Sequence, residues 1–192
     1  ANRKIDEKDF DTLLEAVRLS ASSYGLQPFK FVVVRDPALR QQLRELGYNQ
    51  PQITDASHMI VFAAQKHLSS QEVEDYMSLI SETRGVPLDA LEGFKGAING
   101  SIERKSDAEI MEWNSDQTYI AVGTLLAAAA VMKIDACPME GFQRSQYDEV
   151  LGLDQLNLTS RAIVTLGYRS EEDGLAHAAK VRKSREDLFI ER

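Results

Sequence analysis

The stretch with the most potential for chemistry is residues 134–142, which reads Ile-Asp-Ala-Cys-Pro-Met-Glu-Gly-Phe and follows a long apolar segment. Pro138 cannot donate a backbone hydrogen bond, so we expect regular helix to have ended before it. Glu140 and Gly141 then bring a carboxylate and a backbone N–H into a turn, where glycine allows a flat ligand to approach closely. Turns of this kind also simply connect two secondary-structure elements, without any role in binding. The stretch alone therefore leaves a binding site and a structural turn both open.

The three histidines, His58, His67 and His177, are scattered, and no two of them stand four residues apart. Zinc sites usually use such a pair or paired cysteines, so we expect no metal centre. A Ser-His-Asp triad can be assembled from Ser57, His58 and Asp55, but neighbours in sequence seldom have triad geometry, and no nucleophile-elbow motif is present. A hydrolase is therefore the last of the functional alternatives.

The composition argues against nucleic acid and membranes as partners. Of the 192 residues 43% are hydrophobic, and 30 acidic against 22 basic residues give a net charge of −8. Binding to nucleic acid or to an anionic membrane surface needs concentrated positive charge. The longest apolar run, residues 119–132, is shorter than the roughly 20 residues of a bilayer span. We therefore expect no nucleic acid and no membrane partner.

Cysteine usage and the missing phosphate motifs narrow the alternatives further. Cys137 is the only cysteine, so an intramolecular disulfide is excluded and a reducing, cytoplasmic location is expected. A nearby carboxylate raises the pKa of a thiol, so we interpret Cys137 as a packing residue. Neither a P-loop nor a G-x-G-x-x-G fingerprint is present, so a nucleotide cofactor would have to bind without a Rossmann turn.

Apolar periodicity and turn signals predict helices separated by a few strands, the pattern of an α+β (α/β-like) fold with a central sheet flanked by helices. No repeat or linker divides the chain, so we expect one domain over residues 1–192. Helices are predicted between Asp6 and Ser20, from Pro37 to near Gly47, and over residues 69–83, 88–102, 108–132 and 143–151. Strands are predicted over residues 29–34, 59–64 and 162–168, whereas residues 48–54 and the charged tail 170–192 are expected to be irregular.

The second half of the longest predicted helix, residues 125–130, is apolar all round, so we expect it to be buried on all sides. Its small residues allow another helix to approach closely. The sequence leaves open whether that neighbour belongs to the same subunit or whether the helix is the spine of a dimer.

Taken together, the segments resemble the FMN-dependent nitroreductase family, whose members are dimeric flavoproteins that use NAD(P)H. The resemblance covers nearly the full length and implies a mixed central sheet flanked by helices, with two subunits sharing an extensive interface. Its matching pieces keep the family's order: residues 20–23, residues 27–29, Asn49 with residues 55–58, residues 134–142, and residues 183–185.

The resemblance implies that the cofactor site draws on both subunits of a homodimer. Four residues would touch FMN from the partner subunit: Ser22, Ser23, Gln27 and Pro28. Asn49 would hydrogen-bond the pyrimidine edge of the isoalloxazine. Four others would line one ring face: Pro138, Met139, Glu140 and Gly141. The backbone N–H groups around Glu140 and Gly141 would point at flavin N5, and no side chain is assigned as a general acid or nucleophile.

The sequence departs from the family at two places, at Gln52 near the pyrimidine edge and in the N-terminal segment that would help to bind the phosphate. Lys183 and Arg185 would grip the FMN phosphate, although a plain basic tail is their alternative reading. Gln52 stands where the family often has a lysine, and a neutral amide stabilises an anionic reduced flavin less. The family's N-terminal Arg-x-Ser-type segment has no counterpart, so we expect an upstream segment to be missing. We also expect this form to be flavin-poor, with residues 20–28 and 180–192 displaced or poorly ordered.

The activity implied by the resemblance is a ping-pong reaction. NAD(P)H would deliver hydride to FMN and leave, and a small flat acceptor such as a nitroaromatic, a quinone or a pterin-like ring would then take two electrons in the same pocket. The competing class is a flavin-binding or interaction protein without efficient turnover, which the missing N-terminal segment and Gln52 make plausible.

Overall fold

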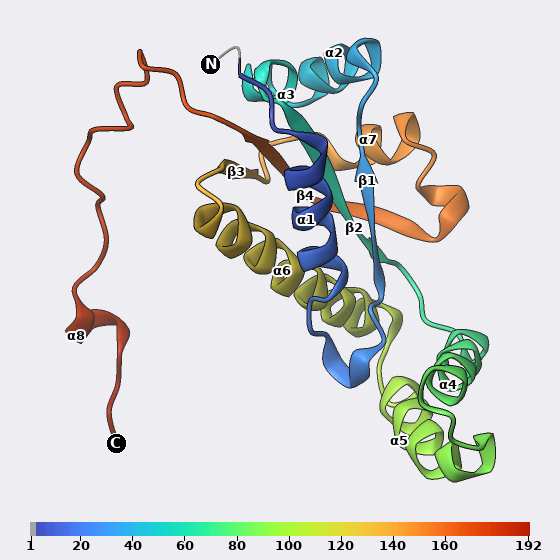
Figure 1. Ribbon diagram of the computed structural model, residues 1–192. Coiled ribbons are helices and arrows are strands. Elements are labelled where there is room, and N and C mark those ends of the chain that lie inside the picture. Colours follow the sequence, from blue (N-terminus) through green and yellow to red (C-terminus); the bar gives the residue numbers. More distant parts are fainter. Residues whose placement is uncertain (1–2) are drawn as a thin grey trace.

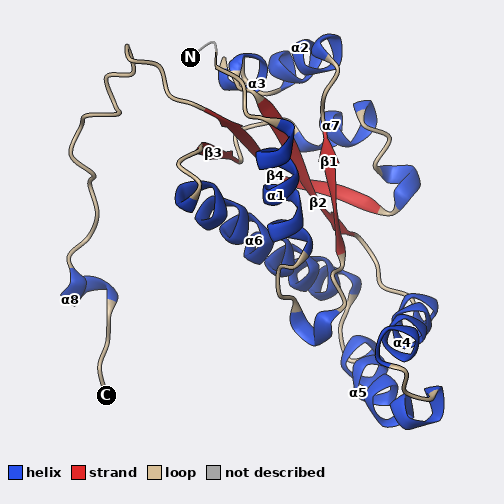
Figure 2. Ribbon diagram, viewed as in Figure 1, coloured by secondary structure: helices blue, strands red, loops and turns tan. Residues whose placement is uncertain are grey.

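The computed structural model describes residues 3–192 (Figure 1) and has a central sheet in the order β1-β2-β4-β3. Its strands are β1 (Phe29–Val33), β2 (His58–Gln65), β3 (Asp135–Met139) and β4 (Leu158–Gly167). Helices flank this sheet on both sides (Figure 2), which confirms the α+β class.

The sheet differs from the expected mixed one, because each strand pairing in the described part of the chain is antiparallel. The segment between β2 and β3 contains three helices: α4 (Ser70–Arg84), α5 (Glu92–Glu103) and α6 (Asp107–Val131). The two strands that it joins run in the same direction, but β4 lies between them, so they never pair. The direction of the strands therefore alternates across the sheet.

Alternate residues of β2 enter the two cores on opposite faces of the sheet. Ile60 and Phe62 pack in the larger core, beneath α1 (Glu7–Arg18) and α6. Met59 and Val61 pack in the second core, which includes side chains from three helices, namely α2 (Pro37–Leu46), α3 (Gln52–Asp55) and α7 (Arg144–Val150). Strand geometry turns successive side chains to opposite faces, so a strand covered on both faces reads as a continuous apolar run.

The helix starts follow their sequence signals. Ser69 and Ser106 each form a capping box with a glutamate three residues later, and Asp36 caps α2 just ahead of Pro37. Gly85 ends α4 in the left-handed conformation that glycine adopts at little cost. These boundaries lie close to the predicted ones.

A helical excursion projects from the sheet at the lower right of Figure 1. It consists of α4, the short 3-10 helix η2 (Leu88–Leu91) and α5. Val73, Met77 and Ile98 are buried in its own small core, separate from the two cores of the sheet. Leu26 packs against this small core, and the Tyr76 hydroxyl donates to Tyr24 O at 2.8 Å, so the excursion is tied to the segment that precedes β1.

Three local predictions were wrong. Residues 134–142 are not simply a turn, because Asp135–Met139 forms the edge strand β3, which accommodates Pro138 since an edge position can spare an N–H. Residues 48–54 are only partly irregular, because α3 begins at Gln52. The last strand begins at Leu158, earlier than the apolar run that predicted it.

The second half of α6 is also less buried than predicted. Leu125 and Ala129 are fully buried, but Ala127 and Ala130 are exposed and Val131 is 85% exposed. One face of the helix packs on the sheet, and the opposite face has no cover from the described part of this chain. Complete burial was expected because the apolar sequence gives no sign of which face is outward.

Beyond β4 the chain leaves the body as a long tail (Figure 1), which contains only the short helix α8 (Arg185–Leu188). Its apolar side chains are exposed, Val181 at 89% and Ile190 at 83%. The prediction of an irregular tail is met apart from α8, although those exposed apolar side chains are unusual for a segment that stays in water.

Candidate functional site

The end of β3 lies against the loop that follows α2. Gln50 Nε2 donates to the carbonyl oxygen of Gly141 at 2.7 Å and to that of Gly47 at 2.9 Å. The Gln143 N–H donates to Leu46 O at 3.0 Å, so the main chain is tied at a second point. Asn49, which lies far from Glu140 in the sequence, is thereby brought beside the turn that the sequence singled out.

The loop that presents Asn49 has an uncommon backbone. Tyr48 and Asn49 have φ values of 54° and 57°, a left-handed conformation that asparagine tolerates better than tyrosine. Both residues are exposed, whereas Ile53 at the next turn is fully buried and anchors the segment. The loop thus presents polar side chains from a fixed base. Gln52 is also exposed, at the first position of α3.

Arg40 fixes the far end of the same segment and was missed by sequence reasoning. Its side chain is only 7% exposed and donates to the carbonyl oxygens of Ile53 at 2.7 Å, Ala56 at 2.9 Å and Ser57 at 3.3 Å. Burial lowers the pKa of this guanidinium. An arginine in an amphipathic helix normally predicts an exposed side chain, so the sequence carried no signal for this role.

The side chain of Glu140 is held by neighbours from two helices. The Tyr119 hydroxyl of α6 donates to Glu140 Oε1 at 2.6 Å, and an Arg144 guanidinium nitrogen lies 3.8 Å from Oε2. Burial, with a smaller contribution from Glu140, raises the pKa of Tyr119 to about 12. Tyr119 also escaped sequence reasoning, because it lies within an apolar run and is indistinguishable there from a core residue.

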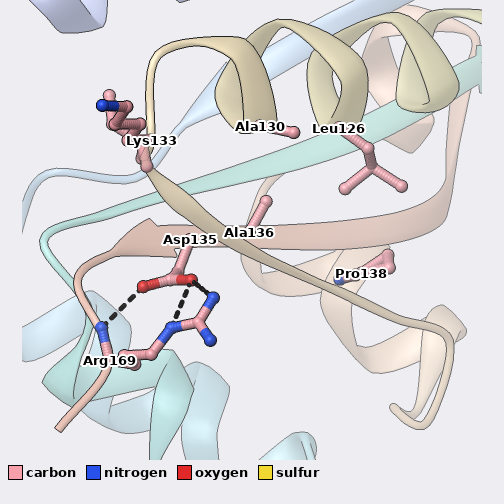
Figure 3. Close-up of a pocket in the computed structure, with 8 residues that line it drawn as sticks. Leu126, Ala130, Lys133, Asp135, Ala136, Pro138 and Arg169 are labelled. Carbon is pink, nitrogen blue, oxygen red and sulfur yellow. Dashed lines mark hydrogen bonds and ion pairs between the residues drawn. The ribbon is translucent and has the colours of Figure 1, made fainter. Parts of the chain in front are cut away.

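Two clefts flank β3. One has a volume of about 580 Å³ and lies between the strand and the end of α6 (Figure 3), where Leu126 and Ala130 face Pro138. At its rim the Arg169 backbone N–H and Nε each donate to Asp135 at 2.8 Å, and these bonds lower the pKa of that carboxyl. This cleft therefore has an apolar floor, and at its rim Arg169 and Asp135 neutralise each other's charge.

The second cleft, of about 600 Å³, lies beside α3 and is lined by Gln52, Cys137 and the basic side chains of Arg3, Arg169 and Lys180. Acidic side chains also line it, so the charge is mixed rather than uniformly positive. Burial raises the pKa of the Cys137 thiol, which supports the interpretation of this cysteine as a packing residue.

Residues 22–28, which were expected to contact FMN from the partner subunit, lie at the end of the sheet opposite α3 (Figure 1). The Ser23 N–H donates to the Gln117 side chain of α6 at 2.7 Å, and Ser22 Oγ accepts from the Gln27 N–H at 2.9 Å. Pro28 is buried just ahead of β1. Within one chain these residues do not join Asn49 and Glu140.

Lys183 and Arg185 also stay apart from the other predicted site residues. Both are exposed in the tail, where Arg185 makes local contacts with Glu191, at 3.8 Å, and with the Phe189 ring. Only the earlier part of the tail, which includes Lys180, reaches the second cleft. The structure thus joins the loop at Asn49 to the turn at Gly141 and places Gln52 in the second cleft. Pro138 faces the first cleft, and Met139 is 6% exposed and packs in the second core, so neither lies beside Gln52. The two other predicted groups lie at a distance.

The described residues 3–192 contain no cluster of three or more histidine, cysteine or acidic side chains arranged to hold a metal ion. Nor does any helix within that range have the length and apolarity needed to cross a membrane.

Comparison with known proteins identifies the class to which this fold and site belong. The family model described as Nitroreductase family matches residues 1–168. YfkO of Bacillus subtilis (strain 168), provisionally named an NAD(P)H nitroreductase, is 34% identical over 97% of this chain and 88% of its own length. A Staphylococcus aureus (strain USA300) protein with the same provisional name is 34% identical over 97% of this chain and 86% of its own. The chain belongs to the nitroreductase family.

Solved structures agree on the fold. A nitroreductase family protein from Streptococcus pneumoniae TIGR4 has a TM-score of 0.83 at 22% identity, covering 100% of this chain and 92% of that one. A protein from Exiguobacterium sibiricum 255-15, provisionally named a nitroreductase and solved with FMN, has a TM-score of 0.86 at 20% identity. That match covers 100% of this chain and 89% of the other. At these identities the likeness establishes the fold alone.

Proposed function

We propose that this protein is an FMN-dependent oxidoreductase that takes hydride from NAD(P)H and reduces small flat acceptors. The observation that carries the proposal is the Gln50–Gly141 hydrogen bond, at 2.7 Å, which joins the loop carrying Asn49 to the turn at Glu140. Two segments that the resemblance assigned to one flavin ring are thereby neighbours in space. Membership of the nitroreductase family and the provisional names of the relatives support the same chemistry.

The chemistry of the side chains fits an isoalloxazine ring. Exposed amides of Asn49 and Gln52 can donate to and accept from the polar pyrimidine edge, and Pro138 is an exposed apolar residue of the strand that leads into the turn at Glu140. Gly141 permits close approach, since a Cβ there would still lie 3.7 Å from Gln50 and 3.8 Å from Tyr48. These contacts are of ordinary van der Waals length, so the turn has room on its open side.

For the phosphate, the chain offers cations in the second cleft and in the tail. Arg3 and Lys180 line the cleft near Gln52, and we propose that Lys183 and Arg185 add to this charge once the tail is placed. Guanidinium groups suit phosphate because they donate two parallel hydrogen bonds.

Bound FMN would supply the redox step, accepting hydride from NAD(P)H and passing two electrons to the acceptor. The protein's own contribution is to hold the ring edge with Asn49 and Gln52 and to aim the backbone N–H groups near Glu140 and Gly141 at flavin N5. We propose nitroaromatic, quinone or pterin-like compounds as acceptors, because one flat surface serves donor and acceptor in turn. That shared surface is what makes the mechanism ping-pong.

We further propose that the functional unit is a homodimer with shared active sites. Ala127, Ala130 and Val131 form an uncovered apolar face on α6. The tail runs away from the body of its own chain (Figure 2), and its apolar side chains are exposed. A second copy could cover both surfaces. It could also bring residues 22–28 to the turn at Glu140, which they do not reach within one chain.

A flavin-binding protein without efficient turnover is the second candidate, because Gln52 puts a neutral amide where a cation would stabilise an anionic reduced flavin. Steady-state oxidation of NADPH and NADH, with FMN added and a quinone or nitroaromatic varied, separates the two. If the protein is a ping-pong oxidoreductase, double-reciprocal plots of rate against NAD(P)H concentration at several acceptor concentrations are parallel lines. FMN binding without NAD(P)H oxidation would support the second candidate, and absence of FMN binding would contradict both.

A further inference from the structure

Tyr119 connects the central helix to the turn after β3. Its ring packs against the larger core, and its hydroxyl donates to Glu140 Oε1 at 2.6 Å. The carbonyl oxygen of Arg161, in β4, lies 3.2 Å from the same hydroxyl. The side chain therefore reaches from α6 past β4 to a residue of the proposed flavin site.

The two neighbours of this hydroxyl compete for one proton. A tyrosine hydroxyl has a single hydrogen, while the carbonyl oxygen of Arg161 and the ionised carboxylate of Glu140 are acceptors only. The carboxylate contact is the shorter, 2.6 Å against 3.2 Å, and hydrogen bonds to a charged acceptor are the stronger kind. The bond to Glu140 is therefore the principal interaction of the Tyr119 hydroxyl.

This bond completes a set of restraints on the peptide between Glu140 and Gly141. Tyr119 and Arg144 hold the Glu140 side chain ahead of this peptide, and Gln50 holds the carbonyl oxygen of Gly141, in the peptide that follows. The carbonyl oxygen of Glu140, within the peptide itself, accepts from the Phe142 N–H at 3.0 Å. The Arg144 contact, at 3.8 Å and partly exposed, is the weak member. Glu140 itself is exposed, so without Tyr119 little else would fix its side chain.

We infer that Tyr119 is a positioning residue that sets the orientation of the Glu140–Gly141 peptide against the flavin. The role rests on the proposed function, because it matters for chemistry only if this peptide faces the ring. The hydroxyl itself touches no reacting atom. Its effect passes through Glu140 to the backbone N–H groups that would bond flavin N5, and those bonds influence how readily the ring accepts hydride.

Tyr119→Phe removes the hydroxyl and keeps the ring, so the core packing is retained. In the flavin-free protein we expect amide hydrogen exchange at Phe142, whose N–H donates to Glu140 O at 3.0 Å, to become about tenfold faster, the size of effect that loss of one hydrogen bond to a charged group produces. In the flavin-loaded protein the midpoint potential should shift and kcat should fall while KM for NAD(P)H stays the same. The matched control is Thr118→Val, which removes a hydroxyl that donates only to Asn114 O within the same helix.

A double-mutant cycle with Glu140 tests the pathway. If Tyr119 acts through this carboxylate, Tyr119→Phe should add nothing to Glu140→Ala in exchange rate or potential. Glu140→Gln, whose amide oxygen still accepts from Tyr119, should restore most of the wild-type behaviour. Additive effects of the two substitutions, or an unchanged exchange rate and potential in Tyr119→Phe, would overturn the role of Tyr119. Failure of the wild-type protein to bind FMN would instead overturn the proposed function, and with it this role.

Discussion

His58 shows how one residue at the start of β2 can couple stability to pH. Its side chain is only 9% exposed, and its ring stacks on that of Phe10 with 3.9 Å between the two ring centroids. Nε2 lies 3.6 Å from Glu7, whereas Nδ1 has no hydrogen-bond partner among the described residues. Burial lowers the pKa of this imidazole, with Arg35 and Arg40 acting in the same direction and Glu7 opposing them. The neutral ring is the form that this environment favours.

The sign of the pH effect follows directly. Since the folded-state pKa of His58 lies below the unfolded value of about 6.5, the unfolded chain binds the proton more readily. The free energy of unfolding should therefore fall as pH drops below about 6.5, until the folded-state pKa is reached. Urea unfolding at pH 8 and at pH 5.5 measures this difference, and His58→Phe should reduce it.

If His58→Phe and the wild type lost the same free energy between the two pH values, the buried imidazole would not be the group responsible.

At the scale of elements, the site depends on how the loop after α2 is tied to the end of β3. Gln50 makes that tie with hydrogen bonds to Gly47 and Gly141. Gln50→Ala should lower the free energy of unfolding by about 1–2 kcal/mol, the usual net contribution of two neutral hydrogen bonds. It should also weaken FMN binding by roughly tenfold, because the loop and the turn that contact the ring would no longer be held together.

Fluorescence titration of FMN and chemical unfolding measure the two quantities. Gln71→Ala is the matched control, since Gln71 lies on an exposed face of α4 and bonds only to Asp75 one helical turn later. An unchanged FMN affinity in Gln50→Ala would show that the loop and the turn do not act as one site.

Most elements could be predicted from the sequence because their signals are local. The apolar run in β2, the capping boxes at Ser69 and Ser106 and the proline start of α2 each depend on neighbouring residues alone. β3 was missed because Pro138 reads as a breaker unless the strand is known to lie at an edge.

The site was only partly predictable, because several of its contacts join residues that are distant in the sequence. Glu140 was singled out from the residue types of its own turn, Asn49 came from the resemblance, and the structure brings their segments together. Gln50, Arg40 and Tyr119 act through contacts with residues distant in sequence, and their types carry no local mark of that role.

For the whole molecule, the uncovered face of α6 and the extended tail lead to a prediction about assembly. If Val131 lies in a homodimer interface, Val131→Asp should place a charge in an apolar contact and shift the protein to monomers at micromolar concentration. Sedimentation velocity measures the shift, and the same variant should lose FMN because each site would lack its partner residues.

Leu156→Asp is the control, since Leu156 is a comparably apolar side chain, 55% exposed, in the 3-10 helix η3 (Asp154–Leu156). It should leave the oligomeric state unchanged. A wild-type protein that sediments as a flavin-loaded monomer would contradict shared active sites.

The central claim is that the loop at Asn49 and the turn at Glu140 receive the same flavin ring. The midpoint potential of bound FMN tests it most directly, because a hydrogen bond to the pyrimidine edge changes the relative stability of oxidised and reduced flavin. The account predicts that Asn49→Ala shifts this potential and lowers turnover while the unfolding transition stays in place, whereas Asn99→Ala, in the helical excursion, does neither. An Asn49→Ala protein with the wild-type potential and wild-type kinetics would contradict the claim.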